Sequence, residues 1–164
     1  MATNYERAFD ERPEVLAAWL QLNAAVKSGM DERRYELATL AAAQRLRSSY
    51  CSLAHGKVLT EAYGEPAADI ARDRSSLEPV DRAVMALAER VVDDATGIDD
   101  SDLDELRSLG LSDGEIMDVV LAAAARCFFS KTLDALGVRP DAGYNDLDAD
   151  LREALVVGRP IAEA

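Results

Sequence analysis

The chain has 164 residues, enough for one domain that folds without a disulfide or a structural metal. Hydrophobic residues make up 49% and charged residues 30%, which excludes an intrinsically disordered chain, and the net charge of −13 argues against nucleic acid and anionic membrane surfaces as partners. A single histidine and two cysteines exclude a four-ligand zinc finger and a multi-histidine metal centre, so we expect no bound metal.

The cysteines and the N-terminus together predict a cytoplasmic protein. Cys51 and Cys127 are too few and too far apart for a secreted disulfide scaffold. The first fifteen residues carry mixed charge without an apolar core, which is not the pattern of a signal peptide. The longest strongly apolar run, Val119–Ala125, is far shorter than the ~20 residues that a membrane span needs.

Helical periodicity covers most of the first half of the chain. Pro13 predicts the first turn of a helix that ends at Gly29. Asp31 is the expected N-cap of a second helix, and a third helix runs from near Ser48 to Gly64. Two further helices are expected at Ala67–Arg72 and Glu78–Ala95.

In the second half, Ser101 is the expected N-cap of a short helix that Gly110 closes. Ser112 and Glu115 have the spacing of a capping box, and they open a long apolar helix that ends at Gly137. We found no β-branched alternation combined with hairpin turns.

The predicted fold class is therefore all-α, with residues 1–164 forming a single domain. The core is expected over about residues 15–141. The mixed, Asp-rich extension at 142–164 is expected to wrap the surface or a neighbouring subunit.

The residues with the clearest chemical potential are Cys51 and His55. On a helix, a spacing of four places both side chains on one face, one turn apart. An imidazole there can take the thiol proton, and the thiolate is the nucleophilic form. With Ser48 as N-cap, Cys51 also lies in the first helical turn, where the helix dipole favours negative charge.

Glu36 is a third candidate, because it lies among residues that are expected to face the core. A carboxylate there is either exposed at the rim or buried with a partner, since an unpaired buried charge is costly. A hairpin of the second and third helices would bring Glu36 to the face of Cys51 and His55. The three groups would then form a relay of orienting group, base and nucleophile.

Structural alternatives stand beside each of these interpretations. A buried cysteine is often a small packing residue, and this reading is favoured for Cys127 in its apolar helix. A lone histidine often only satisfies its own hydrogen bonds. Trp19, Phe128 and Phe129 are expected in the core or at a subunit interface, or as walls of a small pocket beside Cys51.

The arrangement of Glu36, Cys51 and His55 resembles the signature of the alkylhydroperoxidase D (AhpD)-like and carboxymuconolactone decarboxylase superfamily. That signature is a glutamate, a C-x-x-C pair beginning twelve residues later, and a histidine four residues after the second cysteine. Tyr50 and the stretch 128–138 are also similar to family members. The resemblance implies an AhpD-like helical bundle that assembles as a homo-oligomer, a trimer or hexamer, with no metal or organic cofactor.

The resemblance also implies a peroxidase in antioxidant defence, acting on a small hydroperoxide with a thiol reductant. In the redox members the second cysteine attacks the peroxide and the first resolves the product as a disulfide. Ser48 stands at the position of the first cysteine, so a one-cysteine cycle is expected, with Cys51 oxidised to a sulfenic acid. An external thiol or Cys127 would restore it, while His55 relays protons, Glu36 orients His55 and Ser48 is a supporting donor.

Two other functions stay open at this point. The first is a carboxymuconolactone decarboxylase-like lyase or hydrolase, with His55 as general acid and base on a small carboxylated substrate. A basic residue in the pocket would favour it, and Arg45, Arg47 and Lys57 are the candidates by sequence position. The second is an oligomeric homologue that keeps the fold and has lost the redox chemistry.

Overall fold

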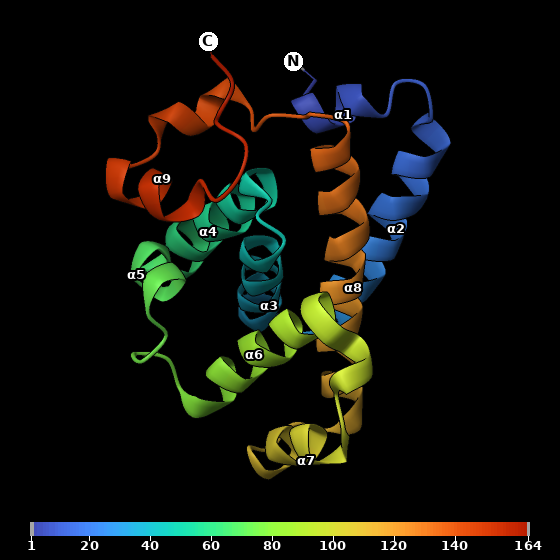
Figure 1. Cartoon of the computed structure of the whole chain (residues 1–164), viewed down its shortest axis with the longest axis vertical. Helices are drawn as coiled ribbons and strands as arrows, with labels where there is room; N and C mark the ends of the chain where they lie inside the picture. Colours follow the sequence, from blue (N-terminus) through green and yellow to red (C-terminus); the bar gives the residue numbers. More distant parts are fainter. Residues whose placement is uncertain (1, 164) are drawn as a thin grey trace.

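The computed structural model describes residues 2–163, which form helices and connecting loops without any β-strand. The predicted all-α class is confirmed. The elements in chain order are α1 (Asn4–Ala8), α2 (Pro13–Gly29), α3 (Glu32–Arg45), α4 (Ser49–Tyr63), α5 (Ala67–Arg72), α6 (Pro79–Asp94), η1 (Ala95–Gly97), α7 (Asp100–Ser108), α8 (Asp113–Ala135), η2 (Ala142–Asp146) and α9 (Ala149–Leu155) (Figure 1).

Local capping chemistry explains where the main helices begin and end. Asp31 caps α3 by accepting a hydrogen bond from the backbone N–H of Arg34, as predicted. Ser112 and Glu115 form the predicted capping box at the start of α8. Gly64 ends α4 with a left-handed φ of 67°, a conformation that costs glycine little.

The prediction for the start of α7 was wrong by two residues. The N-cap is Asp99 and not Ser101, because the Asp99 carboxylate accepts hydrogen bonds from the backbone N–H groups of both Ser101 and Asp102. Helices α1 and α9, which have 5 and 7 residues, were not predicted from the sequence. Helices this short show too few turns for an apolar periodicity.

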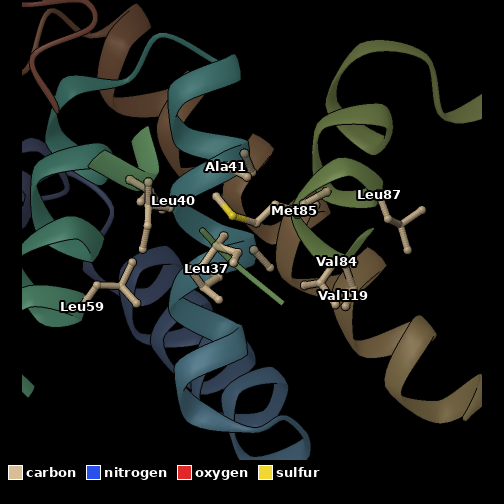
Figure 2. Close-up of a cluster of buried hydrophobic side chains, with 14 of the residues drawn as sticks. Leu37, Leu40, Ala41, Leu59, Val84, Met85, Leu87 and Val119 are labelled. Atoms are coloured by element: carbon tan, nitrogen blue, oxygen red, sulfur yellow. The ribbon is translucent and has the colours of Figure 1, made fainter. Parts of the chain in front are cut away.

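The main core forms where α3 packs against α4, α6 and α8. Figure 2 shows Leu37 and Ala41 of α3 meeting Val84 and Met85 of α6, with Val119 of α8 beside them. These side chains are at most 1% exposed, so α3 is the central helix of the bundle.

A second, aromatic cluster lies where α2 and α8 run side by side (Figure 1). Phe9, Trp19, Tyr50 and Phe129 are all buried in it, and the Trp19 and Phe129 rings are stacked with centroids 3.9 Å apart. Cys51 belongs to the same cluster. The candidate functional site therefore lies at the edge of this second cluster.

The C-terminal extension packs on the chain itself. Leu151 and Leu155 of α9 are buried in the main core, where α9 contacts α4 and α5. Further along, the Gly158 N–H donates to Ser49 Oγ at 2.8 Å. The extension thus covers the helix that carries Cys51 and His55.

Within the described residues, none of the helices combines the length and the apolar character that crossing a membrane requires.

Candidate functional site

Helices α3 and α4 present the residues that the sequence analysis singled out. Cys51 is the third residue of α4, and His55 follows one turn later on the same helix. Glu36 lies in the first half of α3, which packs against α4. The Cys51 side chain is 2% exposed, as is Glu36.

Glu36 is buried with two partners, which decides between the alternatives of a rim-exposed and a paired carboxylate. Its Oε2 lies 2.6 Å from His55 Nδ1, and its Oε1 accepts a hydrogen bond from Lys27 Nζ at 3.1 Å. The chain Lys27–Glu36–His55 thus links α2, α3 and α4. A carboxylate at Nδ1 fixes the orientation of the imidazole.

The surroundings favour a neutral His55 beside an ionised Glu36. Burial, with the charge of Arg126 as the second cause, lowers the pKa of His55. Burial alone would raise the pKa of Glu36, but the hydrogen bonds from His55 and Lys27 outweigh it and hold that pKa below the usual value. A neutral His55 that donates Nδ1–H to Glu36 keeps its Nε2 lone pair free, and this atom is buried without a partner among the described residues.

Arg126, which contacts the thiol, was not among the predicted site residues. Its Nη1 lies 3.6 Å from Cys51 Sγ, and its side chain is 3% exposed. Its Nη2 donates to Asn23 Oδ1 at 3.2 Å and to the Tyr35 hydroxyl at 3.3 Å. A guanidinium at this position compensates the negative charge of a Cys51 thiolate.

A signal for Arg126 was present in the sequence. Arg126 shares a helical face with Ala122, Phe129 and Leu133, at spacings of four, three and four residues, and all four are buried. A basic residue on the apolar face of a helix needs a partner or a function. Which side chains it meets depends on the packing of α8 against α2, which local sequence does not reveal.

Cys51, His55 and Arg126 line one cavity of about 290 Å³. Its walls come from α1, α2, α4, α8 and the loop around η2, with Thr3, Tyr5, Trp19, Leu20, Asn23, Tyr50, Ala54, Phe129, Asp141 and Tyr144 as the other lining residues. Trp19 and Phe129 are thus both core residues and cavity walls, two of the predicted alternatives. Phe128 is 46% exposed and lies outside this wall.

Tyr50, the residue before Cys51, forms a hydrogen bond to the segment that includes η2 and so holds this wall of the cavity in place. The Tyr50 hydroxyl donates to the Asp141 carboxylate, whose other oxygen accepts from the Asn4 N–H at 2.7 Å. Burial and the neighbouring Asp141 raise the pKa of Tyr144 to about 12, and that of Tyr50 is raised as well. Both phenols therefore stay protonated near neutral pH; the Tyr50 O–H is already donated to Asp141, and that of Tyr144 is a donor in the cavity wall.

Ser48 and Cys127 do not join the constellation directly. Ser48 is fully buried at the N-cap of α4, but its side chain makes no capping hydrogen bond, and none joins it to Cys51 in the described part of the chain. Likewise, no hydrogen bond joins Cys51 to His55 there. Cys127 is half-buried and does not line the cavity.

The three basic residues proposed from sequence position lie elsewhere. Arg45 pairs with Asp93 on the surface, Arg47 donates to the Val157 carbonyl, and Lys57 lies 3.9 Å from Glu61. None of them lines the Cys51 cavity. The basic residue of the cavity is Arg126.

Over residues 2–163, no group of three or more His, Cys, Asp or Glu side chains is arranged to hold a metal ion.

The helices that carry the predicted site residues are also the part of the chain that matches a known family. Residues 13–72 match the sequence model of the carboxymuconolactone decarboxylase family. The resemblance to the AhpD-like and carboxymuconolactone decarboxylase superfamily is confirmed. The matched region spans α2 to α5 and contains Glu36, Ser48, Cys51 and His55, but not Arg126.

Solved structures show that the fold is that of the AhpD core. An uncharacterized peroxidase-related protein from Ralstonia eutropha JMP134, described as an alkylhydroperoxidase AhpD core, superposes with a TM-score of 0.81 at 21% identity, over 88% of this chain and 80% of that one. An uncharacterized peroxidase-related protein from Silicibacter sp. TM1040 gives 0.81 at 20% identity, over 89% and 80%. No curated protein matches the chain. Relatives at this identity establish the AhpD-like fold alone.

Proposed function

We propose that the protein is a cysteine-dependent peroxidase of the one-cysteine type, which reduces small hydroperoxides with a thiol reductant. One observation carries the proposal: Cys51 lines a cavity together with His55 and with Arg126, whose Nη1 lies 3.6 Å from the Cys51 sulfur. This is the environment of an activated thiolate, because a base can take the proton and a cation compensates the charge.

The oxidation step uses three residues. In the proposed step, His55 Nε2 takes the proton of the Cys51 thiol, while Glu36 stabilises the imidazolium and Arg126 stabilises the thiolate. The thiolate attacks the terminal oxygen of ROOH, the O–O bond breaks, and the alkoxide takes the proton back from His55. The products are ROH and a Cys51 sulfenic acid, so the sulfur is oxidised and the peroxide reduced by two electrons.

The reduction step needs a thiol from outside the chain. Serine at position 48 cannot form a disulfide, and burial raises the pKa of the Cys127 thiol, which disfavours its thiolate. A first external thiol forms a mixed disulfide with Cys51 and releases water. A second thiol then attacks that disulfide, which frees Cys51 and leaves the reductant oxidised.

We propose Ser48 as a supporting residue rather than a reacting one. It stands at the N-cap of α4, three residues before Cys51, where the dithiol members carry their first cysteine. The free cysteines and the need for a thiol reductant fit a reducing cytoplasm. A homo-oligomer is supported by an exposed apolar face on α8.

The test is consumption of a small alkyl hydroperoxide by the purified protein with a thiol reductant. Cys51→Ser removes the nucleophile and is expected to reduce the rate to that of the thiol alone. The matched control is Cys127→Ser, which is expected to keep the parental rate. Equal rates for the parent and Cys51→Ser would refute the proposal.

A second candidate is acid–base chemistry on a small substrate, as in the carboxymuconolactone decarboxylase branch. The Glu36–His55 pair favours it, because it is complete without the thiol and leaves Nε2 free as a base. Activity that survives Cys51→Ala and is lost in His55→Ala would select this function. If Cys51 were unreactive and neither peroxidase nor acid–base activity were found, the protein would be a redox-inactive homologue.

A further inference from the structure

Arg126 carries a buried charge without a fixed counterion. No carboxylate of residues 2–163 forms an ion pair with it, and its hydrogen-bond partners are the neutral Asn23 and Tyr35 and the thiol of Cys51. Its guanidinium also lies over the Trp19 ring, 5.5 Å from the centroid. Burying a cation without an anion is costly. A Cys51 thiolate balances this charge only while the sulfur is reduced and deprotonated, so a ligand anion is expected to balance it at another stage of the function.

Two side chains that line the cavity also carry unused hydrogen-bond donors. Among the described residues, the indole Nε1–H of Trp19 and the Nε–H of Arg126 are buried and have no acceptor. Both side chains are more than nine-tenths buried, and both line the cavity of Cys51. Indole and guanidinium N–H groups only donate, so their ligand has to be an acceptor.

The carboxylates around the cavity are already engaged. Glu36 is held by His55 and Lys27, and Asp141 is held by Tyr50 and the Asn4 N–H. Neither pairs with Arg126. The two free N–H groups lack acceptors, and the guanidinium lacks a carboxylate partner. An anionic ligand with two acceptor oxygens would supply both.

We propose that Arg126 and Trp19 form a carboxylate-binding subsite beside Cys51. Its ligand is the carboxylate of a small organic co-substrate, either the hydroperoxide or the thiol reductant; only this assignment to a co-substrate rests on the proposed peroxidase function. A further argument favours the thiol reductant as the ligand of this subsite. When Cys51 becomes a neutral sulfenic acid, Arg126 loses the thiolate charge, and a carboxylate that arrives with the thiol replaces it.

Alkylation of Cys51 tests the subsite without peroxide. Iodoacetate and iodoacetamide are close in size and differ in charge, and both transfer a carboxymethyl or carbamidomethyl group to the thiolate with loss of iodide. The measurement is the ratio of the two rates at Cys51 in a Cys127→Ser background. We expect a ratio that favours iodoacetate relative to a free thiol such as N-acetylcysteine.

Trp19→Phe is the decisive variant, because it keeps an aromatic ring beside Phe129 and removes the N–H donor together with one ring of the indole; the neutral reagent iodoacetamide controls for that change of shape. Loss of one hydrogen bond to a charged group is expected to slow iodoacetate about tenfold and to leave iodoacetamide within about twofold. Arg126→Gln is expected to slow both reagents, and iodoacetate more. Equal slowing of both reagents by Trp19→Phe, or a ratio no different from that of the free thiol, would overturn the subsite.

A charge series identifies the ligand. The first series compares the rates at which an anionic, a neutral and a cationic thiol (3-mercaptopropionate, 2-mercaptoethanol and cysteamine) reduce oxidised Cys51. The second series compares the rates at which hydroperoxides with and without a carboxylate oxidise Cys51. A preference for the anionic thiol, abolished in Trp19→Phe, assigns the subsite to the reductant, and the same pattern among hydroperoxides assigns it to the peroxide. If carboxylate-bearing reagents had no advantage in either series, the assignment of the subsite to a co-substrate would be refuted. An intact alkylation ratio without any peroxide consumption would instead refute the peroxidase and leave the subsite standing.

Discussion

At the scale of single residues, His55 is the group on which both candidate reactions depend. Its Nδ1 faces the Glu36 carboxylate, while its Nε2 is buried without a hydrogen-bond partner among the described residues. Burial and Arg126 disfavour the protonated ring more than Glu36 favours it, so the pKa of His55 is lowered. The imidazole is therefore ready to act as a base at neutral pH.

This lowered pKa makes stability depend on pH. The unfolded chain binds a proton at the ordinary histidine pKa of 6.5, and the folded chain only at a lower pH. The free energy of unfolding is thus complete above 6.5 and falls as the pH drops below it, by up to about 1.4 kcal/mol per pH unit. Glu36, whose pKa is also lowered, adds a loss below its ordinary value of 4.5.

Urea unfolding at pH 7.5, 6.5 and 5.5 measures this dependence. In His55→Gln the loss between 6.5 and 5.5 is expected to be smaller than in the parent, because the titrating group is gone. A parent protein as stable at pH 5.5 as at 7.5, or an unchanged loss in His55→Gln, would contradict the assigned protonation state.

Ser48 gives a second prediction at this scale. Ser48→Cys restores a C-x-x-C pair across the first turn of α4, a spacing that allows a disulfide with Cys51. After mild oxidation, intact mass is expected to show the loss of two hydrogens, and the double variant Ser48→Cys with Cys51→Ser shows no such loss. If both thiols of the Ser48→Cys variant stayed free under the same oxidation, the placement of Ser48 beside the nucleophile would be wrong.

At the scale of elements, the position of α4 depends on a close contact with α9. A Cβ at Gly56, one residue after His55, would overlap with Leu155 Cδ1, and Leu155 is fully buried. Glycine at this position lets α9 approach the helix that carries Cys51 and His55.

Substitutions at this contact are expected to be coupled. Gly56→Ala overpacks the contact and costs about 1–3 kcal/mol, and Leu155→Ala leaves a cavity and costs about 2–5 kcal/mol. In the double variant the added methyl occupies part of that cavity, so the total cost is smaller than the sum. Chemical unfolding measures all three, with Gly114→Ala as a control that meets only Ser112 Oγ at 3.8 Å. Strictly additive costs would show that the two residues do not share a contact.

The element scale also shows what the sequence could and could not predict. Pro13, Asp31 and the Ser112 capping box act through their immediate neighbours, so the helices that they begin were predictable. The one-turn spacing of Cys51 and His55 was readable for the same reason. Arg126 was not identified, because its role depends on α8 meeting α2 and α4 across the bundle.

At the scale of the whole molecule, α8 carries an apolar face that residues 2–163 do not cover. Met117, Leu121 and Phe128 share one side of the helix and are 63%, 43% and 46% exposed. A contiguous exposed patch of large apolar side chains is typical of an interaction surface. It supports the expected homo-oligomer.

A charge on this face is expected to weaken the assembly. Phe128→Glu places a carboxylate in the apolar contact and should shift the protein toward the monomer in size-exclusion chromatography with light scattering, without changing its helical content. Ser108→Glu, an equal change of charge at an exposed position of α7, is the matched control. A parent protein that is monomeric at micromolar concentration, or a Phe128→Glu variant that assembles like the parent, would contradict this use of α8.

The central claim of a redox-active Cys51 can be tested most directly by mass spectrometry after one equivalent of a small alkyl hydroperoxide, with dimedone present to trap sulfenic acid. We predict a single dimedone adduct on the peptide that contains Cys51, strongly reduced in His55→Gln and absent from the peptide that contains Cys127. Unmodified Cys51 after complete exposure to the peroxide, or an adduct only at Cys127, would contradict the account.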